Sequence, residues 1–179
     1  MALTAGNVRV AGTGNVFKAP SGTALVTDHT TALNAAFKDL GYYTEDGFKM
    51  NVSKSSTDIK AHNGDVVRTV TNEHKVTFDL TMMEWNLEAA KAEFGSANVT
   101  VATGTTIKVN STAGDRGPFV LEAVDGATKM RIVIPDGQIV TDSQEVTFSN
   151  TASINFPLSI VAYPDGTGNK AYIYTTALT

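Results

Sequence analysis

Cysteine is absent from the 179 residues of this chain, proline occurs five times and tryptophan once. Without cysteine the chain can form no disulfide framework, thiolate nucleophile or zinc ribbon. Long apolar runs are also missing, since no window approaches the roughly eighteen apolar residues of a membrane helix. The opening residues MALTAGNVRV have neither a basic leader nor an apolar stretch. We therefore expect a protein that does not span a membrane and is not exported by a cleaved signal.

Basic residues are few as well. Lys and Arg number 14 against 18 Asp and Glu, which gives a formal charge of -4. Proteins that grip nucleic acid are usually basic, because contacts to phosphate release counterions, so DNA gripping is not expected here. The hydrophobic content of 42% and the length suffice for one buried core. We predict a single domain over residues 1–179.

The motifs of catalysis and cofactor binding are missing too. His29, His62 and His74 show no regular ligand spacing. The glycine-rich stretch 12–14 lacks the third glycine of a nucleotide fingerprint, and no helix follows it, so it is expected to be a turn. No G-x-S-x-G elbow marks a nucleophilic serine, although a Ser-His-Asp triad, being defined by geometry, stays open. We expect no enzymatic activity, metal or cofactor.

Strand patterns, by contrast, run through the whole chain. From Lys75 to Met83 apolar and polar residues alternate strictly, which predicts a strand buried on one face. Asp-Gly turns at 125–126, 136–137 and 165–166 break up a mainly antiparallel β fold, either a sandwich or a small closed barrel. The predicted strands are 8–11, 15–19, 42–52, 58–61, 66–71, 73–83, 99–102, 106–110, 119–124, 129–134, 138–141, 145–148, 154–163 and 171–176.

One short helix is predicted from Leu87 to Phe94. Asn86 can cap its first N–H groups, and Gly95 can end it in the left-handed conformation. We expect the helix to flank the sheet through an apolar stripe. The residues expected to pack there are Trp85, Leu87, Ala90 and Phe94. A weaker helical spacing occurs over 31–40.

Several runs of residues in the first half of the chain follow one another in a recognisable order. They are APSGT (19–23), FKDLGYYTEDG (37–47), STDIKA (56–61), VVRTVT (66–71), EWN (84–86) at the end of the alternating strand, and FG (94–95) at the end of the helix. As an ordered set they resemble the major tail tube proteins of long, non-contractile phage tails, especially in phages that infect actinobacteria. The second half of the chain resembles that family only in strand rhythm.

This resemblance implies a structural protein of the virion tail that assembles in the host cytoplasm. Copies of the chain would form hexameric rings with a shared inner β-barrel, and the rings would stack into a helical tube. Expected partners are the chain itself and the tape measure, tail tip and tail terminator proteins. The genome would pass through the lumen without specific binding, which an acidic or neutral wall favours.

Two sets of residues are candidates for these roles. The long segment from Pro20 to Leu40 would be either a mobile loop or an arm that orders on a neighbouring ring. The anchors of such an arm would be Pro20, Leu25, Val26, Phe37 and Leu40. The acidic residues expected to face the lumen are Asp79, Glu122, Asp125, Asp142 and Glu145.

Two other functions fit the same patterns. A tube protein of a contractile tail or an Hcp-like secretion ring would share the fold, although the FKAPSGT and STDIKA runs favour the non-contractile tail. A carbohydrate-binding, adhesive β-sandwich would need exposed aromatic side chains that stack on sugars. Its candidates are Tyr42, Tyr43, Tyr172 and Tyr174.

Overall fold

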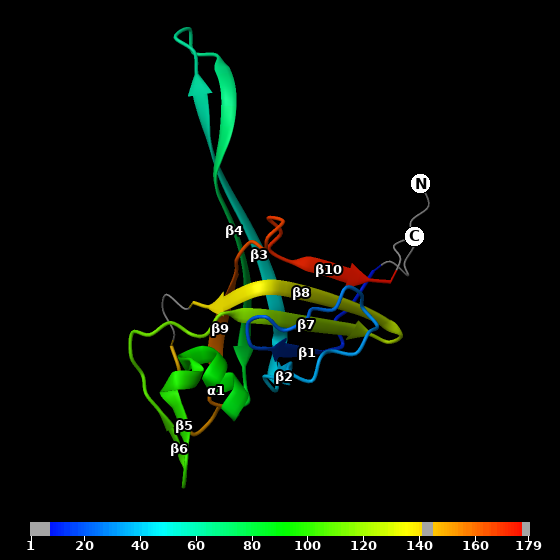
Figure 1. Ribbon diagram of the computed structural model, residues 1–179, viewed down its shortest axis with the longest axis vertical. Coiled ribbons are helices and arrows are strands. Elements are labelled where there is room, and N and C mark those ends of the chain that lie inside the picture. Colours follow the sequence, from blue (N-terminus) through cyan, green and yellow to red (C-terminus); the bar gives the residue numbers. More distant parts are fainter. Residues whose placement is uncertain (1–7, 141–144, 177–179) are drawn as a thin grey trace.

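The computed structural model describes residues 8–140 and 145–176. In chain order its elements are β1 (Thr13–Lys18), β2 (Lys38–Asp39), β3 (Tyr43–Lys60), β4 (Val66–Met82), α1 (Leu87–Phe94), η2 (Ser96–Asn98), β5 (Val99–Val101), β6 (Thr105–Ile107), β7 (Gly117–Asp125), β8 (Thr128–Ile139), β9 (Phe156–Ala162) and β10 (Tyr172–Thr175). The large antiparallel sheet has the order β2-β1-β7-β8-β9-β4-β3, with β10 also on β8, and β5 pairs with β6 (Figure 1). The predicted mainly-β class with one short α-helix is confirmed.

Strand β8 belongs to two packed layers. Its first part pairs with β7 and β10, and its last residues, Gly137–Ile139, pair with β9. A Cβ added to Gly137 would lie 2.9 Å from a ring carbon of Phe119 and 3.1 Å from a methyl carbon of Ile160, so glycine permits the close approach. The turn predicted at Asp136-Gly137 is wrong, because this pair lies at an irregularity in the register that carries β8 from one layer into the other.

The main core lies between these layers. Along β4 the predicted alternation is confirmed: Val76, Phe78, Leu80 and Met82 are buried, while the residues between them are half-buried. Strand β9 alternates in the same way beside it. Each large apolar side chain buried here stabilises the fold by about 1.5–3 kcal/mol. The facing layer supplies Val16, Phe119, Leu121, Ile132 and Ile134.

A second, smaller core covers the other face of β7 and β8. Val120 and Val133 point into it and meet Ala19, Val26 and Phe37 from the segment that follows β1. Residues 117–122 of β7 are therefore all buried. A strand covered on both faces reads as a continuous apolar run, which explains why the sequence GPFVL lacks alternation.

Several predicted elements differ from the observed ones. The four predicted strands over 42–83 are two long ones, β3 and β4, which pair from Tyr43 and Met82 outward with three register irregularities. The segments 8–11 and 145–148 form no strand, and both are mostly exposed. The weak helix predicted over 31–40 is wrong, because this segment is turns and the short strand β2. The turns predicted at 125–126 and 165–166 are confirmed.

Helix α1 has the predicted bounds. The Asn86 side chain accepts a hydrogen bond from the Ala89 amide at 2.8 Å, and Gly95 follows the helix with a φ of 83°. The packing prediction needs correction, because the buried positions are Ala89, Ala90 and Ala92, whereas Leu87 is 37% exposed. Of these alanines, Ala92 belongs to the main core. Trp85 and Phe94 do pack, edge to face at 6.1 Å, and Trp85 also lies 3.9 Å from the ring of Phe156.

No helix in the described part of the chain is long and apolar enough to cross a membrane.

Replacement of Asn86 by alanine should destabilise the protein by about 1–2 kcal/mol. The change removes the cap on Ala89 and the bond that the Asn86 amide donates to the Leu40 carbonyl at 2.9 Å. Asn86→Ser, which keeps a cap acceptor, should restore about half of the loss. Urea unfolding followed by circular dichroism measures the difference. Equal midpoints for Asn86→Ala and the wild type would contradict the capping role.

Candidate assembly surface

The most prominent feature of the surface is a hairpin that projects from the domain. This projecting hairpin consists of residues 49–75, from β3, β4 and the turn between them. It extends well beyond the two packed layers (Figure 1). All of its residues are exposed except Val70, which is half-buried. At about 3.3 Å per residue, the part from Ser53 to Lys60 alone reaches about 25 Å. A two-stranded hairpin is marginally stable by itself in water. Contact with another protein surface would stabilise the projecting hairpin.

The apolar residues of the projecting hairpin change faces along its length. Near the domain Met50 and Val52 lie opposite Phe78 and Val76 and continue the core face outward. A register irregularity follows at Asn72, because Ser55 pairs with Glu73 and Ser56 with Thr71. Strand residues alternate between the two faces. One extra residue in β4 therefore moves its apolar side chains to the other face.

Beyond this bulge Ile59 and Val70 share the face opposite to that of Met50 and Val52. Ile59 and Val52 are 52% and 51% exposed. The projecting hairpin thus offers two separate apolar patches that point in different directions. One flat interface could not cover both of them.

The tip of the projecting hairpin is ordered by its own hydrogen bonds. The Ala61 amide donates to the Asp65 carbonyl at 2.7 Å, and the Gly64 amide donates to the Ala61 carbonyl at 2.9 Å. Gly64 has a φ of 91°, which a side chain would strain. On the strands the Thr69 hydroxyl donates to Asp58 at 2.6 Å. The free subunit can therefore present a preformed tip.

Strand β3 also has an open edge. It ends the order of the large sheet and pairs only with β4 among the described residues. Its 18 residues leave N–H and C=O groups along the outer side without a strand partner. Unpaired edges of this length invite pairing with another chain. Edge pairing between copies would replace water at these groups with backbone hydrogen bonds.

The segment from Pro20 to Leu40, predicted to be an inter-ring arm, lies against its own subunit. Val26, Phe37 and Leu40 are buried in the subunit's cores, while Pro20 and Leu25 are exposed. Burial leaves the first three no apolar surface to offer a neighbour in this arrangement. The inter-ring role stays a prediction, and only Pro20 and Leu25 present surface for it.

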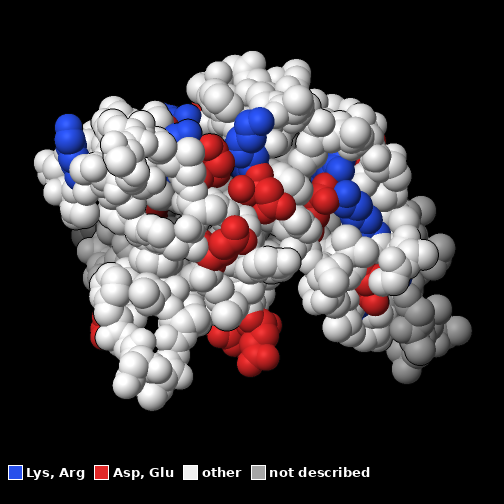
Figure 2. Space-filling model, turned by 90° about the horizontal axis from the view of Figure 1, so that it is seen from below, with Lys and Arg blue, Asp and Glu red and all other residues white. Residues whose placement is uncertain are grey.

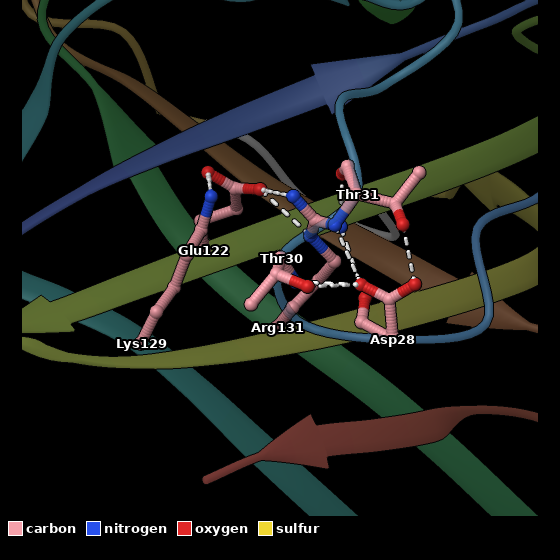
Figure 3. Close-up of polar contacts among 6 residues, drawn as sticks. All are labelled: Asp28, Thr30, Thr31, Glu122, Lys129 and Arg131. Atoms are coloured by element: carbon pink, nitrogen blue, oxygen red, sulfur yellow. Dashed lines mark hydrogen bonds and ion pairs between the residues drawn. The ribbon is translucent and has the colours of Figure 1, made fainter.

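A buried arginine holds this segment in place. Arg131 on β8 is 2% exposed. Its Nη1 donates to the carbonyls of Asp28 and Thr31 at 2.9 and 2.8 Å, and its Nε donates to Glu122 at 2.8 Å (Figure 3). Lys129 adds a second ion pair to Glu122 at 2.6 Å. The guanidinium therefore connects the sheet to the 28–31 turn.

The 28–31 turn is itself fixed by the Asp28 carboxylate. It accepts bonds from the Thr30 and Thr31 amides, both at 2.6 Å, and from both hydroxyls (Figure 3). The bonds from Thr31, and then from Thr30, hold the pKa of Asp28 below its usual range. This turn presents two carbonyl oxygens to Arg131 in a fixed geometry.

The acidic residues predicted to face the lumen are dispersed. Glu122 is buried and paired with Arg131 inside the subunit, so the prediction that it is exposed on a wall needs correction. Both oxygens of Asp79 accept hydrogen bonds, from Asn51 and Ser159 at 2.6 Å. Asp125 lies at the β7–β8 turn, and Glu145 is exposed in a loop. Asp142 lies outside the described residues.

The aromatic residues considered for sugar binding are largely engaged. Tyr172 and Tyr174 stack on each other at 6.2 Å, and both pack against the second core. The Tyr172 hydroxyl donates to Asp165 at 2.6 Å and helps lower the pKa of that carboxyl to about 2. Tyr43 packs edge to face on Phe48, which leaves Tyr42 as the freely exposed ring.

Within the described ranges, no group of His, Asp and Glu residues could hold a metal ion. The features suited to contact with another protein chain are the exposed apolar side chains of the projecting hairpin and the open edge of β3.

Comparison with solved structures finds the same fold in two other proteins. One match is the anti-feeding prophage cap, described as a tube terminating cap, with 6% identity, a TM-score of 0.55, and coverage of 98% of this chain and 95% of that one. Another is from the sheath-tube complex of an extracellular contractile injection system in its extended state, with 8% identity, a TM-score of 0.52, and coverage of 99% and 100%. At such identities the likeness shows the fold alone.

Sequence comparison is more specific about the family. A search of curated proteins gives no match. Residues 1–177, nearly the whole chain, match the family described as phage tail tube protein. The resemblance in the first half of the sequence is thus confirmed at the level of that family. The chain belongs to the phage tail tube protein family and is a structural, non-enzymatic component of the virion tail.

Proposed function

We propose that copies of this chain form hexameric rings that stack into the tube of a long, non-contractile phage tail. The observation that carries the proposal is the projecting hairpin together with the open edge of β3. Both are costly for a protein that works alone, because they expose apolar side chains and unpaired backbone groups. Both are satisfied when another copy covers them.

The geometry favours closed rings that also stack. Contact between the β3 edge of one copy and a different surface of the next is head-to-tail, and such contacts close into a ring when the rotation allows it. The two apolar patches of the projecting hairpin face different directions, so one can meet a neighbour in the same ring and the other a subunit of the next ring. A single hairpin would thereby connect a subunit to two copies.

The lumen of this tube would conduct the genome during ejection. The formal charge of -4 suits a wall that does not hold phosphate. Asp79, Asp125, Asp142 and Glu145 stay candidates for that wall, whereas the buried Glu122 does not. The tape measure, tail tip and tail terminator proteins would be the further partners, and assembly would take place in the host cytoplasm.

Electron microscopy of the purified protein over a concentration series, paired with sedimentation, tests this proposal. Hollow filaments of one width are expected, and averaged end-on views should show six subunits. A protein that stays monomeric at every concentration, and also when tail tip complexes are added as initiators, would contradict it. A different number of subunits would contradict the hexamer and leave the tube intact.

A further inference from the structure

The subunit has an open cavity where the end of β1, the short strand β2 and helix α1 come together. Its volume is about 540 Å³, which is within the range of pockets that hold one small molecule. Ala19, Leu40 and Ala92 supply apolar lining, and each is at most 3% exposed. Every described residue that lines the cavity lies outside the projecting hairpin. The cavity is therefore a feature of the domain itself.

Lys18, the last residue of β1, lines the cavity and is half-buried. Its Nζ lies 5.6 Å from the ring centroid of the fully buried Phe119. Among the described residues it has no carboxylate within 4 Å, and an aromatic ring replaces only part of the hydration that burial removes. Burial lowers the pKa of Lys18, and the charges of Asp115 and Glu88 oppose this lowering. Its ammonium group can therefore take a further acceptor.

Two other cations of the cavity are neutralised by carboxylates that they contact. Lys91 and Glu88, which lie one turn apart on α1, form an ion pair at 3.1 Å. Arg116 pairs with Asp136 of β8. An incoming anion would have to compete with an existing carboxylate for either of these cations. Neither is thus as available to an anion as Lys18.

The remaining charged groups that line the cavity are Lys38 and Asp115. The Lys38 Nζ donates to the Ala35 carbonyl at 3.0 Å, and Asp115 accepts a bond from the Ser96 amide at 2.8 Å. Both residues are exposed. With the two ion pairs set aside, Lys18 and Lys38 leave one positive charge in excess over Asp115. The cavity thus favours an anion, although the whole chain has a formal charge of -4.

The charge of the surrounding surface is mixed. Figure 2 views the end of the subunit opposite to the hairpin tip, and α1 and β2 lie toward this end in Figure 1. Lys and Arg side chains lie next to Asp and Glu side chains near the middle of the face in Figure 2. Such a surface attracts neither a polyanion nor a polycation strongly, because fields of opposite sign cancel. Selection of a ligand then depends on the half-buried ammonium group and on the apolar lining of the cavity.

We infer that this cavity binds a small aliphatic carboxylate. The carboxylate accepts a charge-assisted hydrogen bond from the Lys18 Nζ, and the carbon chain covers Ala19, Leu40 and Ala92. An aliphatic alcohol would lack the charge that this hydrogen bond needs, and an aliphatic amine would place like charges together. The inference does not depend on the proposed tube, because the lining residues come from one subunit.

Isothermal titration calorimetry of the free subunit with hexanoate tests the inference. Acetate has the same head group without the chain, and hexan-1-ol has the chain without the charge. Hexanoate should bind at least about tenfold more tightly than either compound, because buried CH₂ groups and a hydrogen bond between charged groups both contribute to its affinity. Hexylammonium has the chain with the opposite charge and should bind at least about tenfold more weakly than hexanoate.

A substitution at Lys18 assigns the binding to this cavity. Lys18→Met removes the ammonium group and keeps an unbranched apolar side chain, so it should weaken hexanoate binding at least about tenfold and leave hexan-1-ol binding unchanged. The control Lys108→Met changes an exposed lysine outside the cavity and should bind both compounds like the wild type. Circular dichroism establishes that both variants are folded.

The pH dependence provides a second readout. Hexanoate binding should weaken as the pH rises through the pKa of Lys18, because the ligand stays ionised while the ammonium group loses its proton. Lys18→Met should lose this part of the pH dependence. Equal affinities of the wild type for hexanoate and hexan-1-ol would overturn the inference. It would also be overturned by equal hexanoate affinities of Lys18→Met and Lys108→Met, or by a folded wild type that binds no hexanoate.

Discussion

A subunit in which residues 55–73 are replaced by Asn-Gly is expected to fold normally and to form no tubes. The new turn would connect Lys54 to His74, which already pair across the two strands, and Asn-Gly is the favoured two-residue hairpin turn. No buried residue is lost, since 55–73 are exposed apart from half-buried Val70. The free energy of unfolding should therefore change by no more than about 1 kcal/mol. Assembly should fail, because the distal apolar patch and most of the open edge of β3 are gone.

Two controls make this result interpretable. Replacement of residues 61–65 alone by Asn-Gly introduces the same turn but keeps both apolar patches, Lys60 and Arg68, so tubes should still form. Urea unfolding of the shortened subunit should show an unchanged midpoint, with a smaller slope in proportion to the lost surface. Tubes of normal width and length from the shortened subunit would show that the projecting hairpin is dispensable. An unfolded shortened subunit would show that the hairpin contributes to the core.

The elements that the sequence predicts well have a regular spacing of apolar residues, or capping residues that mark where the element begins and ends. In β4 the alternation through Val76, Phe78, Leu80 and Met82 requires one face to be covered, whatever covers it. Helix α1 has a cap at Asn86 and a glycine at 95, so its bounds depend on neighbouring residues only. Its buried face depends on which distant segments pack against it, so the local pattern does not predict that Leu87 is exposed.

Contacts between residues far apart in the sequence account for most of the differences between the predicted and the observed elements. The polar run over 53–57, between two predicted strands, has the composition of a loop, and only its pairing with β4 makes it part of β3. The segment over 31–40 has helical spacing, but Phe37 and Leu40 are drawn into two different cores, which a helix of that length could not reach together.

One missed feature did have a signal in the sequence. The Asp125-Gly126 turn sets the register of β7 and β8, and counting outward from it places Glu122 opposite Arg131. Opposite charges that face each other on an otherwise apolar hairpin indicate a buried ion pair rather than two surface charges. This reasoning would have moved Glu122 from the predicted lumen to the core.

Arg131→Ala is expected to lower the free energy of unfolding by about 3–5 kcal/mol. The change leaves the buried Glu122 with Lys129 as its remaining partner. It also removes the donor to the carbonyls of Asp28 and Thr31 and opens a cavity under the loop. Arg131→Lys should recover only part of the loss. The planar guanidinium donates at once to Glu122 and to the carbonyls of Asp28 and Thr31, and the smaller ammonium group cannot reproduce this geometry. Urea unfolding measures the change.

The chain offers a matched control in Arg116, whose side chain is 50% exposed and pairs with Asp136 at the surface. Arg116→Met removes the same guanidinium at a site that water reaches, so it should lower the free energy of unfolding far less than Arg131→Ala does. Limited proteolysis separates a local from a global effect, since a loop released from Arg131 should be cleaved within 21–36 before the sheet unfolds. Equal destabilisation by Arg131→Ala and Arg116→Met would show that the buried guanidinium does not hold the loop. The large difference we expect would show that Arg131 keeps the 20–40 segment on its own subunit. There Val26, Phe37 and Leu40 pack in the cores. The projecting hairpin is then the feature left to contact neighbouring copies.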